Sequence, residues 1–109
     1  MSDAYKTLAQ AAPAAATLTP AYTVPAATAT VVASATVCNQ SATPDLFRVS
    51  VAVSDAADTA AQYLYYDLPI SGNDTFIATI GATLAATDVV RVRSANGTCS
   101  FNFFGVERS

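Results

Sequence analysis

The segment Val89-Val90-Arg91-Val92-Arg93-Ser94-Ala95-Asn96-Gly97-Thr98-Cys99-Ser100-Phe101-Asn102-Phe103-Phe104 decides the fold class of this chain. It holds two runs in which apolar and polar side chains alternate, a pattern typical of β-strands with one buried face. Asn96-Gly97 lies between the runs and indicates a type I′ turn, because both central positions of that turn need a positive φ. We therefore predict an antiparallel hairpin in which Val92 faces Phe101 and both arginines lie on the opposite face.

Outward from this hairpin, further alternating stretches lie at 31–38, 47–53, 62–68 and 75–80, with turn-rich segments between them. Seven or eight short strands at spacings of roughly ten residues, without a helix signal, predict an all-β antiparallel sandwich. A closed β-barrel is the alternative, since the strand count does not separate the two. Within the 62–68 strand we expect Tyr63 and Tyr65 to share one face, opposite Tyr66.

The N-terminal part of the chain differs in composition, because residues 1–25 are rich in Ala, Thr and Pro. Prolines at these intervals would limit any helix to two turns. We predict an extended arm over 1–25 with edge strands at Tyr5–Gln10 and Thr17–Val24, followed by the sandwich domain over 26–109. The arm either completes the sheet of its own domain or reaches a neighbouring subunit. Its candidate contact residues are Pro13, Pro20 and Tyr22.

The low charge of the chain excludes several classes of partner. Its 109 residues carry only 12% charged side chains and a net charge of −3. The five scattered cations argue against nucleic acid, and no apolar stretch is long enough to span a membrane. The N-terminus shows no secretory signal, so we expect a reducing cytosol. Cys38 and Cys99 are therefore interpreted as two small buried hydrophobic residues rather than a disulfide.

The residue types present do not suggest catalysis. The chain has no histidine, which excludes Ser-His-Asp and Cys-His arrangements and most zinc sites. Its four glycines are isolated, so no phosphate-cradling loop is expected. The aspartates are interpreted as turn caps, and we predict no catalytic residue, cofactor or metal.

Aromatic and arginine side chains remain as candidates for binding a partner. Tyr63 and Tyr65 would suit stacking on a sugar ring or anchoring a protein, although core or subunit contacts are the more common role of such residues. Arg91 and Arg93 project side by side, either into interface ion pairs or into solvent.

Six strand and turn segments of the chain are similar to those of a known group of proteins. They are Tyr22-Thr23-Val24-Pro25, Val37-Cys38-Asn39, Phe47-Arg48-Val49, Tyr66-Asp67-Leu68-Pro69, Ala85-Ala86-Thr87-Asp88-Val89-Val90-Arg91-Val92 and Phe103-Phe104-Gly105-Val106-Glu107. With these segments the chain resembles short virion proteins of tailed bacteriophages, including cyanophages. The likeness runs from about Lys6 to Glu107, and Cys99 departs from it because an aliphatic residue is usual there. The resemblance implies a non-enzymatic particle component that assembles in the bacterial host cytoplasm.

We therefore expect a capsid decoration, or cement, protein that binds the major capsid protein or other virion proteins as a homo-oligomer. A hydroxyl-rich sandwich suits many repeated weak contacts, whose sum across a lattice is large. A tail, baseplate or fibre module is the alternative, and a carbohydrate-binding module is a further one.

Overall fold

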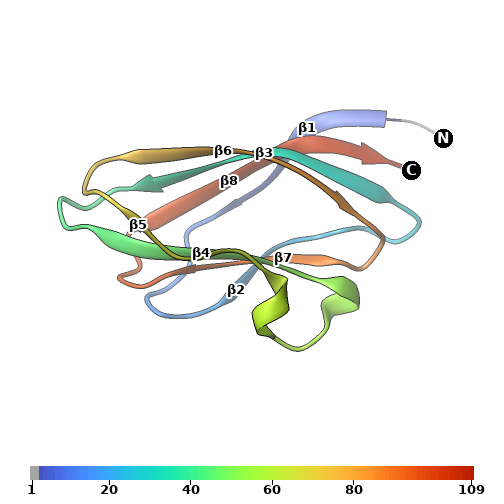
Figure 1. Ribbon diagram of the computed structural model, residues 1–109. Helices are drawn as coiled ribbons and strands as arrows, with labels where there is room; N and C mark the ends of the chain where they lie inside the picture. The colour runs from blue at the N-terminus through green and yellow to red at the C-terminus, as the bar shows by residue number, and fades with distance from the viewer. Residues whose placement is uncertain (1–2) are drawn as a thin grey trace.

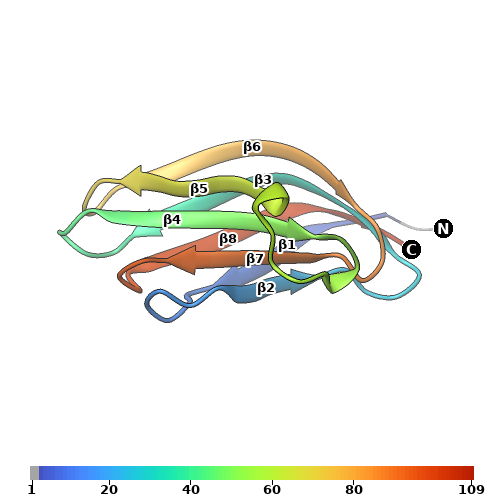
Figure 2. The same cartoon turned by 60° about the horizontal axis from the view of Figure 1, so that its bottom comes forward.

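Two four-stranded antiparallel sheets pack face to face in the computed structural model, which describes residues 3–109 (Figure 1). The first sheet, sheet A, has the strand order β1-β8-β3-β6, and sheet B has the order β2-β7-β4-β5 (Figure 2). Two short 3₁₀ turns, η1 (Val53–Asp55) and η2 (Ala60–Gln62), lie between β4 and β5. The strands are β1 (Asp3–Ala11), β2 (Thr19–Thr23), β3 (Ala29–Asn39), β4 (Asp45–Ala52), β5 (Tyr63–Ile70), β6 (Thr75–Leu84), β7 (Val89–Ser94) and β8 (Cys99–Arg108).

The strand order is that of a jelly roll. β1 pairs with β8, β2 with β7, β3 with β6 and β4 with β5, all antiparallel. The chain thus resembles one long hairpin that is folded over on itself. Because of this folding, successive strand pairs lie alternately in sheet A and sheet B. The predicted all-β sandwich is confirmed, and because the two sheets do not join, the barrel alternative is wrong.

The predicted hairpin pairing is also wrong. β7 pairs with β2 and β4, whereas β8 pairs with β1 and β3 in the other sheet. Only Gly97 of the Asn96-Gly97 pair has a positive φ, of 71°, so no type I′ turn forms. The backbone N–H of Asn96 instead donates to the Asp45 carboxylate at 3.0 Å. This connection is therefore a corner between the two sheets, and it brings β7 and β8 face to face across the core.

The core lies between the sheets and is aromatic at its centre. Phe47, Phe101 and Phe103 have at most 1% of their surface exposed. The ring centroid of Phe47 is 6.1 Å from that of Phe101 across the layers and 5.6 Å from that of Phe76. The faces that alternation predicted for β7 and β8 are as expected, since Val90, Val92, Phe101 and Phe103 are all buried.

Of the predicted N-terminal arm, residues 3–25 are described, and they contribute edge strands to the two sheets of this chain. β1 forms one edge of sheet A and β2 one edge of sheet B, close to the predicted strands at Tyr5–Gln10 and Thr17–Val24. Leu8 of β1 is buried in the core. The exposed Pro20 on the edge strand β2 is compatible with an edge position, because its missing N–H breaks no pairing.

Buried polar groups fix each end of the sandwich. At one end the Asp45 carboxylate accepts hydrogen bonds from Ser94 Oγ, from the Leu46 N–H at 2.8 Å and from the Asn96 N–H at 3.0 Å. Burial opposes ionisation of Asp45, but these bonds outweigh it and lower its pKa below the ordinary value. At the other end Tyr22 Oη contacts Thr30 Oγ1 at 2.9 Å and donates to Glu107 Oε2.

The two cysteines lie on neighbouring strands but on opposite faces of sheet A. Cys38 is in register with Ser100, and Cys99 with Asn39, so their side chains point to opposite sides. Neither is disulfide-bonded. Cys99 is buried as predicted, whereas Cys38 is half-buried on the outer face. Burial, followed by the hydrogen bond to Asp45, raises the pKa of the Cys99 thiol to about 12.

Candidate interaction surface

The outer face of sheet B gathers arginine and tyrosine side chains from β4, β5 and β7. Alternation along β4 and β7 directs Arg48, Arg91 and Arg93 outward, opposite the buried valines. On β5 the register shifts twice against β4, and Asp67 adopts a positive φ of 51°. We call this surface the arginine–tyrosine face, and it consists of Arg48, Tyr63, Tyr66, Asp67, Arg91 and Arg93.

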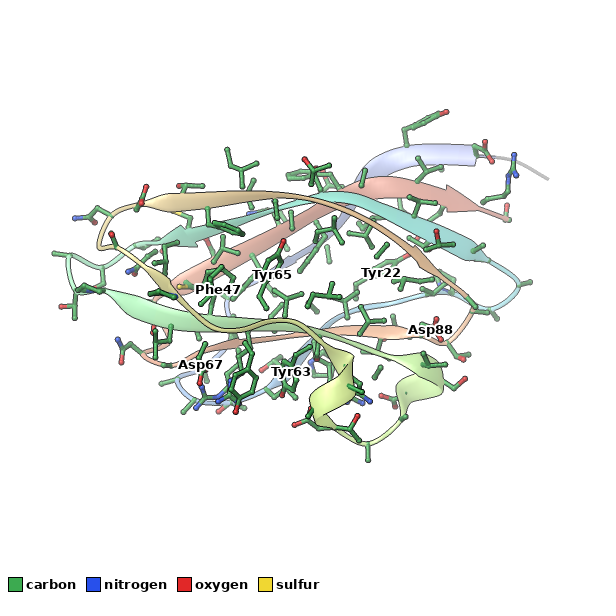
Figure 3. All side chains as sticks on the ribbon, in the orientation of Figure 1. Tyr22, Phe47, Tyr63, Tyr65, Asp67 and Asp88 are labelled. Carbon is green, nitrogen blue, oxygen red and sulfur yellow. The ribbon has the colours of Figure 1, made fainter. Side chains whose placement is uncertain are left out.

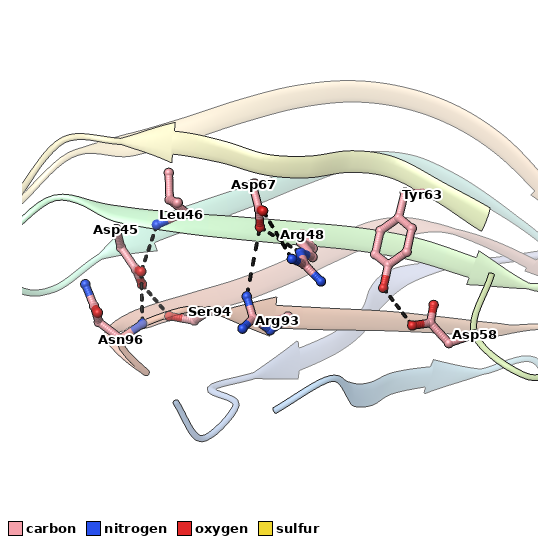
Figure 4. Close-up of polar contacts among 9 residues, drawn as sticks. All are labelled: Asp45, Leu46, Arg48, Asp58, Tyr63, Asp67, Arg93, Ser94 and Asn96. Atoms are coloured by element: carbon pink, nitrogen blue, oxygen red, sulfur yellow. Dashed lines mark hydrogen bonds and ion pairs between the residues drawn. The ribbon is translucent and has the colours of Figure 1, made fainter. Parts of the chain in front are cut away.

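Arg48 is the centre of the face. Its Nε donates to Asp67 Oδ1 at 2.7 Å and its Nη2 to Asp67 Oδ2 at 3.1 Å, a two-pronged ion pair (Figure 4). Its guanidinium carbon also lies 4.0 Å from the centroid of the Tyr66 ring, within cation–π range. The hydrogen bonds from Arg48 lower the pKa of Asp67, and those to Asp67 raise the pKa of Arg48. Three contacts thus hold the guanidinium in one orientation.

The two tyrosines of the face stand edge to face. The ring centroids of Tyr63 and Tyr66 are 5.0 Å apart with an interplanar angle of 87°. Tyr63 Oη donates to Asp58 Oδ2 at 3.1 Å, and burial together with this bond raises the Tyr63 pKa. Tyr66 keeps 60% of its surface exposed. A rigidly held and accessible aromatic ring is therefore available to a partner.

The remaining arginines of the face are also matched by carboxylates of the same chain. Arg91 Nη2 lies 2.7 Å from Asp55 Oδ1, and Arg93 Nη1 lies 3.9 Å from Asp67 Oδ1. Arg48 and Arg93 share Asp67. With Asp55, and with Asp58 beside Tyr63, three carboxylates stand against the three arginines, so the surface is close to electrically neutral. It is suited to planar stacking and hydrogen bonding rather than to attraction of a highly charged polymer.

The structure brings four of the seven predicted contact residues to this side of the molecule. Tyr63, Arg91 and Arg93 belong to the face, and the exposed Pro20 is in register with Arg91 on the edge strand beside it. The other three, Pro13, Tyr22 and Tyr65, lie elsewhere.

Tyr65 corrects the prediction made for the tyrosines. It does not share a face with Tyr63: its ring lies between the sheets, with its centroid 5.5 Å from that of Phe76 and 6.1 Å from that of Phe47 (Figure 3). The reason is an extra residue in β5, since Ser50 pairs with Tyr63 while the preceding Val49 pairs with Tyr65. This β-bulge changes the phase of the alternation, so that Tyr66 joins Tyr63 on the outer face.

Pro13 and Tyr22 are buried within this chain, so neither side chain is accessible to a partner. Pro13 lies in the link between β1 and β2. Burial and the hydrogen bond to Glu107 raise the pKa of Tyr22 to about 12. The geometry indicates a structural role for Tyr22, which joins the two layers (Figure 3).

Sequence reasoning missed Arg48, Tyr66 and Asp67. The alternation of Phe47, Arg48 and Val49 already indicated an outward Arg48, and this signal was available. The positions of Tyr66 and Asp67 depend on the two register shifts of β5 against β4, which no turn residue in the sequence indicates.

No group of three or more His, Cys, Asp or Glu side chains within residues 3–109 is arranged to hold a metal ion. None of the helical turns in that range is long and apolar enough to cross a membrane. No family model matches the chain, and neither does any curated protein.

Proposed function

We propose that this chain is a non-enzymatic structural protein of a tailed-phage virion, a capsid decoration protein whose arginine–tyrosine face contacts the shell. The observation that carries the proposal is the Arg48–Tyr66–Asp67 arrangement, in which a guanidinium and an exposed ring are held in place before any partner arrives. Tyrosine and arginine are the residues that most often dominate protein interfaces. Preorganisation also lowers the entropy lost on binding.

Two further observations support a virion role. The eight-stranded jelly roll is an architecture used by viral capsid proteins, although it also occurs in lectins and other proteins, so this support is by analogy. The segments that resemble tailed-phage virion proteins include Phe47-Arg48-Val49 and Tyr66-Asp67-Leu68-Pro69, which contain the three central residues of the face.

The direct test is binding to particles that lack the protein. Purified wild-type chain should restore an even layer over the shell, seen by electron microscopy of labelled protein. Tyr66→Ala and Arg48→Ala should each weaken this binding at least about tenfold, the loss typical of an interface hot spot. Ile77→Ala is the matched control, because Ile77 is exposed to a similar degree on the opposite outer face.

The same experiment separates the alternatives. Label confined to the tail or baseplate would replace decoration by the tail-module function. Unchanged binding of both variants would contradict the role of the arginine–tyrosine face.

A carbohydrate-binding function is the second candidate, and the exposed Tyr66 ring and the Asp67 carboxylate, which both contact Arg48, favour it. Such a platform would use Tyr66 and Tyr63, not Tyr65. Binding on a glycan array that is lost in Tyr66→Ala, but retained in Tyr5→Ala, would support it.

A further inference from the structure

The outer face of sheet A carries an apolar groove. It lies at the end of the sandwich where β1 begins and β8 ends, which can be located in Figure 1. Its floor is one row across the four strands, because Tyr5 is in register with Val106, Val106 with Val31, and Val31 with Thr83. The groove has a volume of about 410 Å³, and Asp3 and Arg108 lie at its end. Tyr5 stands at the edge of the row with 81% of its surface exposed.

The charge at the groove is self-complementary. Arg108 Nε donates to Asp3 Oδ1 at 2.8 Å, and the two residues are in register on β8 and β1. Of the described side chains that point outward from sheet A, these two alone are charged. This surface, with one acidic and one basic side chain, does not complement a partner that is strongly positive or strongly negative. It does complement a second copy of itself.

We infer that this groove is the two-fold interface of a homodimer. An axis that lies in the contact plane and runs between β1 and β8 places each outward residue of β1 opposite its registered neighbour on the second copy. Tyr5 then packs on the second copy's Val106, and Asp3 meets the second copy's Arg108. The next registered pair, Thr7 and Phe104, continues the contact along the strands.

The inference is independent of the arginine–tyrosine face, which lies on the opposite side of the sandwich. A dimer leaves both copies of that face exposed, so a virion partner and a second copy are compatible. The dimer should form in solution without particles, so its failure and the failure of shell binding are distinguishable.

The test is the oligomeric state of the whole chain, measured by sedimentation velocity over a wide concentration range. Wild type should associate to a dimer. Tyr5→Lys should weaken dimerisation at least about tenfold, because it replaces the packed ring with a charge. Ile77→Lys should leave the dimer intact, because Ile77 lies on the same face but outside the groove.

A charge exchange makes the test specific to this axis. Asp3→Arg alone and Arg108→Asp alone should each be mainly monomeric, because like charges then meet across the axis. An equimolar mixture of the two variants should form a heterodimer, detectable by native mass spectrometry. A monomeric wild type, or variants that dimerise as well alone as when mixed, would overturn the inference; circular dichroism checks that each variant is folded.

Discussion

The two outer faces of the sandwich differ in what covers them and in how their charges are arranged. The outward residues of sheet A are mostly hydroxyl, amide or apolar groups, and the one ion pair among those that the structure describes joins Asp3 and Arg108. Sheet B presents three arginines, each within 4 Å of a carboxylate, and the segment 53–62 lies over part of it (Figure 1). The same core therefore supports one open face and one partly covered, preorganised face.

The segment 53–62, which covers part of sheet B, buries side chains on the outer face of that sheet. Ala52 and Val89 are in register, and although both point outward they are only 0% and 3% exposed. Asp88 holds the covering segment in place. Its carboxylate accepts hydrogen bonds from the Ser54 N–H and from the Ala85 N–H, both at 2.9 Å. The difference teaches that an outward position in a sheet is not necessarily an exposed one.

The largest expected effect comes from placing a charge at an outward position of each face. Ala52→Lys should lower the free energy of unfolding by about 3–5 kcal/mol, because the ammonium would be buried without a partner. Ile77→Lys on sheet A should change it by less than about 0.5 kcal/mol, as at an open surface. Urea unfolding followed by circular dichroism measures both, and equal effects would contradict the difference in cover.

A smaller effect is expected from removing one arginine from each face. Arg48→Met should lower stability by about 1–2 kcal/mol, since it removes a two-pronged ion pair and the contact with Tyr66. At a concentration low enough for the chain to be monomeric, Arg108→Met should leave the urea midpoint unchanged, because the Arg108 side chain is 58% exposed and solvent screens its pair with Asp3. A larger loss for Arg108→Met than for Arg48→Met would reverse this ranking of the two faces.

The pH dependence of the free energy of unfolding should depend on Asp67, the carboxylate of the arginine–tyrosine face. The pKa of Asp67 is lowered by Arg48, so the unfolded chain binds this proton more readily than the folded one. The stabilisation is complete above the ordinary aspartate pKa of about 3.9 and is lost as the pH falls through the lower folded value. Asp67→Asn should therefore flatten the stability profile below about pH 4. Some slope should persist, because the pKa of Asp45 is lowered too.

The smallest effect concerns the two sides of sheet A and leaves stability unchanged. Cys38, half-buried on the outer face, should react with a thiol reagent in the native protein. Cys99, buried and with a pKa of about 12, should react only after unfolding. Mass spectrometry of the labelled chain should find one modified thiol, and Cys38→Ser should abolish native labelling. Two thiols labelled at the same rate would show that the inner face is open.

Sequence reasoning went furthest where a single strand is considered by itself. It predicted the all-β class, and it predicted which sides of β7 and β8 are buried, because alternation directly reports contact with a core. It failed for Tyr65 and Tyr66, since one extra residue in β5 inverts the alternation. It also could not find the cover on sheet B, because Ser54 and Asp88 are far apart in the sequence.

The hairpin prediction shows the limit most clearly. From the sequence alone, Val92 and Phe101 belong to strands that each bury one side. Whether such strands pair side by side or pack face to face depends on their other neighbours, since both arrangements bury the same residues. The tertiary structure decides between these arrangements. The Asp45 carboxylate accepts a hydrogen bond from the Asn96 N–H, and the turn at Gly97 packs on Ala15 so closely that a Cβ on residue 97 would lie 2.8 Å from the Ala15 backbone nitrogen. Local pattern thus determined the buried faces of β7 and β8, and only contacts between distant segments determined which strands are neighbours.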